Sequence, residues 1–149
     1  MDELASTVMI EFPLITAESR VAPEHFHARW CDLATHPEWA PGMEYIRLEG
    51  PLRVGARGVM KAREGEETLF LVSDLVPGLA FQDTLLLEGG ELTVRHESHQ
   101  LGTGSRLELH ARIDGPRAGE LADGFAGLEK VLAADLANLI ALMESEHRD

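Results

Sequence analysis

The sequence lacks several features that would assign it to particular classes of protein. It holds a single cysteine, Cys31, so no disulfide can form within the chain, which fits a reducing compartment such as the cytoplasm. No apolar run reaches the roughly 20 residues that a membrane-spanning helix needs. The start of the chain, from Met1 to Ser6, is acidic. It lacks the positively charged region and the apolar region of a signal peptide. We therefore expect a cytoplasmic protein with no membrane span.

Positive charge is also scarce. The chain has 13 Lys and Arg against 26 Asp and Glu, which gives a formal net charge of −13 at pH 7. Such a surface repels the phosphate backbone of nucleic acids and anionic membranes. We expect no nucleic-acid partner, and the acidic excess is typical of a soluble surface.

What is present fits a single globular domain over residues 1–149. The hydrophobic fraction of 44% and the charged fraction of 26% are ordinary for a globular protein of this length. Alternating apolar residues predict a strand from Thr7 to Leu14. Pro23 begins a short helix that places Phe26 and Trp30 on one stripe. A second helical turn or loop follows over residues 36–41, where prolines bound it.

Strands and tight turns dominate the middle of the chain. Glycine and proline turn signals separate six predicted strands, over 43–49, 56–64, 67–76, 79–88, 91–101 and 105–114. Because the turns are short, the strands should pair as antiparallel hairpins in sequence order.

The last part of the chain predicts one long amphipathic helix. Apolar residues recur at steps of four and three from Leu121 to Met143, with Asp135 off this stripe. Gly119, Gly124 and Gly127 weaken the first turns. Either this end frays or another segment approaches it closely.

The hairpin over residues 81–98 carries the most informative pattern. Gly89 and Gly90 would supply the positive φ angles of its turn. Folding about that turn places Asp83 opposite His96, on a face that is otherwise mostly apolar. The same register pairs Leu87 with Leu92, Leu85 with Val94 and Phe81 with Ser98. Because a buried sheet face normally excludes charge, the carboxylate and the imidazole predict a polar spot in an apolar pocket.

The inward parity of this hairpin extends to the neighbouring strands. It predicts inward positions for Leu107, Leu109, Ala111 and Ile113 on the last strand, and for Phe70, Val72 and Asp74 on the strand before the hairpin. A loop of odd length before Glu67 places Met60 inward, whereas a two-residue loop would place Lys61 there. The odd loop is favoured because burying cations is costly.

This order of elements resembles the helix-grip fold of the Bet v 1-like, or START (SRPBCC), superfamily, and more narrowly its polyketide cyclase/dehydrase-like group. The resemblance rests on Val21–Glu24 at the first helix, Trp39–Pro41 after the second, Gly50-Pro51 followed by Gly55, the His96 strand, and Gly115-Pro116 before the last helix. It implies an α+β fold in which a seven-stranded antiparallel curved sheet wraps around a long C-terminal helix. Two short helices lie between strands 1 and 2. A cavity between sheet and helix would hold an apolar or amphipathic small molecule.

The expected cavity has mostly apolar walls. Its predicted lining is Trp30, Phe70, Val72, Phe81, Leu85, Val94, Ser98, Leu109, Phe125, Leu128 and Leu132. Core packing alone would also explain the aromatic residues. Ser98 would either hydrogen-bond a ligand or lie near the open end of the sheet.

Asp83 and His96 allow two interpretations. In the functional one, Asp83 orients His96, which binds a ligand oxygen or transfers a proton as a catalytic residue. In the structural one, the two form a partly buried ion pair that fixes the strand register. A shift of register would separate them.

Other chemistry finds little support in the sequence. His96 and His99 are three apart on a strand and point to opposite faces, and His25 and His27 diverge on a helix. No Cys/His cluster has the spacing of a zinc site, so we expect no metal and no cofactor. No serine lies in a Gly-x-Ser-x-Gly elbow.

Three functions follow from these observations. The first is binding of a hydrophobic or amphipathic small molecule between sheet and helix. The second is a polyketide cyclase or dehydratase in which His96 and Asp83 are the acid/base pair. The third is a protein-interaction module such as a chaperone activator, which would need an exposed apolar groove. The sequence decides neither whether the protein is an enzyme nor whether it forms a homodimer.

Overall fold

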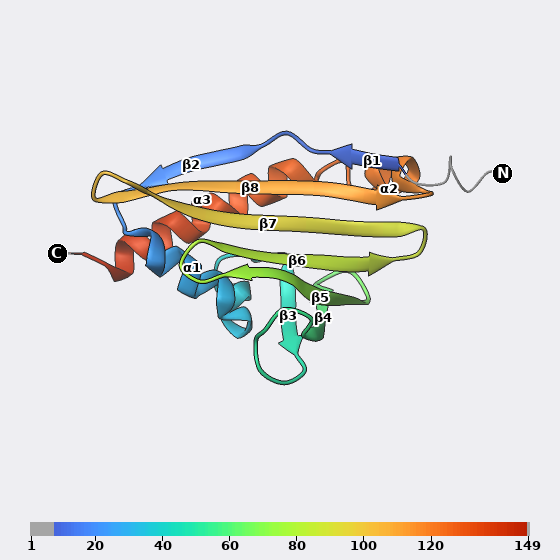
Figure 1. The fold of residues 1–149 in the computed structure, drawn as a ribbon, viewed down its shortest axis with the longest axis horizontal. Coiled ribbons are helices and arrows are strands. Elements are labelled where there is room, and N and C mark those ends of the chain that lie inside the picture. Colours follow the sequence, from blue (N-terminus) through green and yellow to red (C-terminus); the bar gives the residue numbers. More distant parts are fainter. Residues whose placement is uncertain (1–7, 149) are drawn as a thin grey trace.

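The sheet and one long helix define the architecture. In the computed structural model of the chain, which describes residues 8–148, eight strands form one antiparallel sheet, with α3 crossing behind β7 and β8 (Figure 1). The strand order is β1-β8-β7-β6-β5-β4-β3, and β2 also pairs with β8. The strands are β1 (Val8–Glu11), β2 (Ile15–Ser19), β3 (Met43–Leu48), β4 (Arg57–Ala62), β5 (Glu67–Val76), β6 (Ala80–Leu87), β7 (Gly90–Leu101) and β8 (Gly104–Gly115). The predicted helix-grip arrangement is confirmed.

The strand predicted over residues 7–14 is divided in two. Both parts pair with β8, because Ile10 lies opposite Ile113 and Ile15 lies opposite Leu109. The break falls at Pro13, whose missing N–H interrupts strand pairing. This division accounts for eight strands where seven were predicted, and Thr7 lies outside the described residues.

Two short helices connect β2 to β3, as predicted. Helix α1 (Pro23–Cys31) has proline in its first turn and buries Phe26 and Trp30. The 3-10 helix η2 (Leu33–Glu38) follows and buries Leu33. Because α1 packs on β6, β7 and β8, it covers the inner face of the sheet at the end near the β7–β8 turn.

The middle strands confirm one predicted orientation and correct another. Met60 pairs with Thr68 and is 8% exposed, while Lys61 donates to Glu44 at the surface. The odd loop before Glu67 is therefore confirmed. The inward position predicted for Asp74 is wrong, because a register shift at Ser73 turns Asp74 to the outer face.

The single helix predicted over residues 121–143 is two helices, α2 (Ala118–Gly124) and α3 (Leu128–Glu146). A Cβ on Gly119, Gly124 or Gly127 would meet nothing within 4 Å. Close approach is therefore not the reason for these glycines, and their low helix propensity explains the break.

Side chains of the sheet and helices form two apolar clusters. The larger cluster joins α1, η2 and the inner face of the sheet to Leu136, Leu139 and Met143 of α3. The smaller one lies between the far end of the sheet and Ala118 of α2. Leu85 and Leu132 pack against both clusters. Within residues 8–148, no helix has the length and apolar character needed to cross a membrane.

Candidate ligand site on the inner face of the sheet

The register of the β6–β7 hairpin differs from the prediction by two residues. Asp83 lies opposite Val94, and His96 lies opposite Phe81, so the predicted direct pairing of Asp83 with His96 is wrong. The turn is formed by Glu88 and Gly89, because Leu87 already pairs with Gly90. Since the displacement is an even number of residues, both polar side chains keep the inner face and become diagonal neighbours.

Gly90 explains this displacement. Of the two glycines only Gly89 has a positive φ, of 90°. A Cβ on Gly90 would lie 2.5 Å from the carbonyl oxygen of Asp114 and 2.9 Å from Leu121 Cδ1. Gly90 therefore permits close approach of β8 and α2 and does not shape the turn.

Asp83 is a buried carboxyl with little to compensate its charge. It is 5% exposed and lies between Val72 and Val94 on the adjacent strands. Among residues 8–148, no other side chain donates a hydrogen bond to it. Burial raises the pKa of Asp83 from 3.8 to about 7, although its own backbone N–H opposes that change. This carboxyl is therefore protonated to a much higher pH than an ordinary aspartate.

His96 is buried among aromatic rings. Its ring centroid lies 5.3 Å from that of Trp30 and 5.7 Å from that of Phe81. Burial lowers the pKa of His96 to about 4, against the opposing effect of its hydrogen bond with the Phe81 carbonyl. The neutral ring donates Nδ1–H to that carbonyl over 3.2 Å, which leaves Nε2 as an acceptor.

Four buried side-chain polar atoms have no hydrogen-bond partner among the described residues: Ser98 Oγ, His36 Nδ1, Trp39 Nε1 and, on α1, His27 Nδ1. Ser98 follows His96 on the same face of β7. The ring of His36 lies 4.0 Å from that of Trp39. Burial, and secondarily the nearby His96, lower the pKa of His36 to about 3. No pattern in the sequence indicated His36, because its position depends on how η2 packs against the sheet.

The predicted lining residues divide by burial. Seven are almost fully buried: Trp30, Phe70, Val72, Phe81, Val94, Ser98 and Leu109. Four keep part of their surface exposed: Leu85, Phe125, Leu128 and Leu132. These four pack around the smaller cluster, at the N-terminal half of α3. The apolar members of the predicted lining therefore belong to the two packed apolar clusters, and their remaining exposed area lies near that half of the helix.

Asp135 lies on α3, where sequence reasoning placed it off the apolar stripe. It is partly buried, and burial raises its pKa from 3.8 to about 6. One turn later, Asn138 donates a hydrogen bond to the Trp39 carbonyl over 3.1 Å. Because residues three apart share a helix face, Asp135 lies on the side of α3 directed toward η2. The signal in the sequence was its spacing of three and four residues from Leu132 and Leu139.

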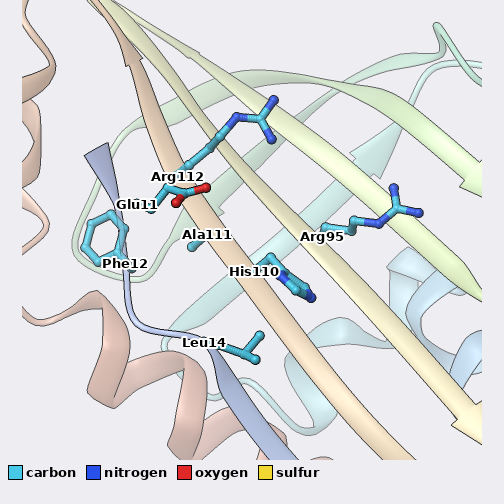
Figure 2. Close-up of a pocket in the computed structure, with 7 residues that line it drawn as sticks. All are labelled: Glu11, Phe12, Leu14, Arg95, His110, Ala111 and Arg112. Atoms are coloured by element: carbon cyan, nitrogen blue, oxygen red, sulfur yellow. The ribbon is translucent and has the colours of Figure 1, made fainter. Parts of the chain in front are cut away.

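Two surface pockets lie away from these residues. One, of about 350 Å³, is formed at the break between β1 and β2 by Glu11, Phe12, Leu14, Arg95, His110, Ala111 and Arg112 (Figure 2). The other, of about 410 Å³, is lined by Glu18, Ser19, Arg20, Leu101, Thr103, Gly104 and Glu144. Neither contains a residue of the predicted lining.

Comparison with known proteins identifies the fold. No protein-family model and no curated protein matches the sequence. Among solved structures, norcoclaurine synthase from Thalictrum flavum, in complex with dopamine and hydroxybenzaldehyde, has a TM-score of 0.71 at 19% identity, over 97% of this chain and 91% of its own. Major latex-like protein 151 from Panax ginseng has a TM-score of 0.71 at 10% identity, over 93% and 98% of the two chains.

A bacterial structure is similar to the same extent. Protein SA2116 from Staphylococcus aureus, described as of unknown function, has a TM-score of 0.73 at 12% identity, over 96% of this chain and 98% of its own. The chain therefore has the Bet v 1-like fold. At these identities the likeness concerns the fold alone, and the polyketide cyclase/dehydrase-like group stays a prediction.

Proposed function

We propose that this chain, which has the Bet v 1-like fold, binds an apolar or amphipathic small molecule between the inner face of its sheet and the N-terminal half of α3. One observation carries the proposal. Asp83 and Ser98 lie on an apolar sheet face without a side-chain partner among the described residues, and His96 Nε2 offers a further acceptor there. A buried polar group without a partner costs about 1–3 kcal/mol, and a ligand that supplies the missing hydrogen bonds would offset part of that cost.

The apolar surroundings indicate the chemistry of the ligand. Leu85 on β6 and Leu132 on α3 are partly exposed and contact both apolar clusters. A ligand that moved these two side chains aside would contact apolar surface on the sheet and on the helix. Such walls provide affinity, and a few polar groups set orientation. We expect a ring or chain carrying a hydroxyl or carbonyl group, because Ser98 donates and accepts while His96 Nε2 accepts. The complex of norcoclaurine synthase with two small aromatic compounds is consistent with this class.

A pair of tryptophan variants tests the proposed location. Leu132 is partly buried toward the sheet, whereas the adjacent Val131 is 52% exposed. The probe is 1-anilinonaphthalene-8-sulfonate, whose fluorescence rises in apolar sites. We expect Leu132→Trp to fill the space and weaken probe binding at least tenfold, and Val131→Trp to leave it unchanged. Equal affinity of both variants and the parent would contradict the proposal.

Asp83 favours a second candidate function, a cyclase- or dehydratase-type enzyme. A carboxyl with a pKa of about 7 exists in both protonation states at neutral pH, which suits general acid/base catalysis. In this version Asp83 transfers the proton and His96 Nε2 accepts a hydrogen bond from the substrate. The roles differ from those predicted from sequence, in which Asp83 only oriented His96.

Measuring both turnover and binding distinguishes a ligand-binding protein from a cyclase- or dehydratase-type enzyme. Polyketide-like substrates would be screened against the parent chain and against Asp83→Asn and His96→Ala variants. For an enzyme, we expect Asp83→Asn to retain binding and to lose both turnover and an apparent pKa near 7 in its pH profile. Turnover that is unchanged in Asp83→Asn would eliminate the enzymatic role.

A further inference from the structure

A repeated pattern lies on the outer face of the sheet, away from the proposed ligand site. Residues 95–99 on β7 and residues 106–110 on β8 both read Arg-x-Glu-x-His. Alternate residues of a strand share a face, so each pattern presents three polar side chains outward. The register pairs Glu97 with Glu108, Arg95 with His110, and His99 with Arg106. The two patterns are therefore related by a local two-fold axis between the glutamates.

In each of the two glutamates, one carboxylate oxygen contacts a histidine and the other contacts an arginine. Oε1 of Glu97 lies 2.9 Å from His99 Nε2, and Oε1 of Glu108 lies 3.1 Å from His110 Nε2. The Oε2 atoms accept hydrogen bonds from arginine, over 2.5 Å from Arg95 and 3.0 Å from Arg106. Each arginine therefore orients a carboxylate whose other oxygen is directed toward a histidine.

We propose that Glu97, His99 and Glu108 bind a divalent transition-metal ion such as Zn²⁺, with His110 beside Glu108 at the edge of the site. The donor atoms of the first three residues all lie within 4.8 Å of one another. A tetrahedral zinc site with bonds of about 2.0–2.1 Å places its ligand atoms roughly 3.3 Å apart. A modest convergence of the side chains therefore forms the site.

The surroundings allow this convergence. The side chains of His99 and His110 are 39% and 46% exposed, whereas both glutamates are 18% exposed and held by arginine. Hydrogen bonds to ligating carboxylates usually orient them for metal binding. Arg95 also shares its charge with Asp74, 2.8 Å away, which reduces its repulsion of a cation. An imidazole nitrogen among the ligands favours zinc or copper over calcium or magnesium.

Sequence reasoning missed this group because it compared histidines along single elements. His99 and His110 join one group only through the pairing of β7 with β8, which places them on either side of the Glu97–Glu108 pair. The signal was the repeated Glu-x-His spacing on two strands joined by a tight turn.

Calorimetric titration of the full, tag-free chain with Zn²⁺ tests the proposal, after removal of metal with a chelator. We expect one Zn²⁺ per chain, and at least tenfold weaker binding in the His99→Ala/His110→Ala double variant. The matched control is His25→Ala/His147→Ala, because these two rings also lie close together, with centroids 3.9 Å apart. The control should bind as the parent does.

Two results would overturn the proposal. One is the absence of stoichiometric Zn²⁺ binding by the parent, which would leave the group as a network of surface ion pairs. The other is binding that survives in the His99/His110 variant or is lost in the His25/His147 control. Circular dichroism of each variant establishes that it is folded, and titration with Co²⁺ adds a visible absorption band that reports nitrogen and oxygen ligands directly.

Discussion

Replacing Asp83 by asparagine should remove a pH-dependent destabilisation of the folded chain. Asp83 has a pKa of about 7 in the fold, against an ordinary value of 3.8. Between these values the folded state holds a proton that the unfolded state has released. The free energy of unfolding therefore falls as pH rises.

The magnitude follows from the two pKa values. One pKa unit corresponds to about 1.4 kcal/mol, so the difference between 3.8 and about 7 amounts to about 4 kcal/mol, lost progressively as pH rises through this window. Asparagine has the same shape and no charge, so any cost of burying its amide is the same at every pH. Relative to the parent, Asp83→Asn should gain about 4 kcal/mol of stability between about pH 4 and pH 8.

His96 and His36 obscure this effect in the parent chain. Their pKa values fall from 6.5 to about 4 and about 3, respectively, so the unfolded state binds protons that the folded state lacks. Their contribution to stability is present above pH 6.5 and is lost as pH falls. It therefore opposes that of Asp83 in the acidic range, and only the difference between variant and parent isolates the carboxyl.

Urea unfolding at a series of pH values measures that difference, with the fluorescence of the buried Trp30 and Trp39 as the signal. Asp74→Asn is the matched control, since Asp74 is on the outer face of the adjacent strand and its hydrogen bond from Arg95 lowers its pKa. The control difference should be flat above about pH 5. A flat difference for Asp83→Asn as well would refute the reasoning, because it would show that Asp83 titrates alike in the folded and unfolded states.

The same unfolding assay checks three further expectations. Gly104→Ala should destabilise the chain by about 2 kcal/mol or more, because its Cβ would lie 2.1 Å from the Ser19 carbonyl oxygen; an effect under about 0.5 kcal/mol would contradict the tight pairing of β2 with β8. Leu139→Ala removes a side chain with 0% exposure and should cost about 2–5 kcal/mol, whereas Val131→Ala on the same helix should cost less than about 0.5 kcal/mol. Ser98→Ala should be neutral or stabilising, because its buried hydroxyl has no partner among the described residues, and a loss above about 1 kcal/mol would reveal a bound water or ligand.

Much of the fold follows from local patterns in the sequence. The strands from β3 to β8 agree with the prediction because short glycine turns fix antiparallel neighbours. The inward parity of Leu107 and Leu109 is confirmed, since the displacement of the hairpin by two residues preserves the face. The glycines at the start of the last helix indicated a weak point there. Their spacing did not show whether that end would fray or whether another segment would pack closely against it.

The site depends on details that no local pattern contains. Gly89 and Gly90 offer two turn positions, and the choice between them depends on Gly90 meeting Asp114 and Leu121, which are distant in sequence. The bulge that turns Asp74 outward has no signature in the alternation of β5. The same limit applies to His36 and to the Glu97–Glu108 pair, because both depend on how separate elements pack.

Amide chemical-shift mapping of the parent chain tests the central claim of ligand binding most directly. The labelled protein would be titrated with 1-anilinonaphthalene-8-sulfonate and followed by two-dimensional NMR. We expect the shifts to concentrate around Asp83, Leu85 and His96 on the sheet and around Leu128 and Leu132 on α3. Shifts confined to the pocket near Phe12 and His110, or none at saturating probe, would contradict a binding site between sheet and helix.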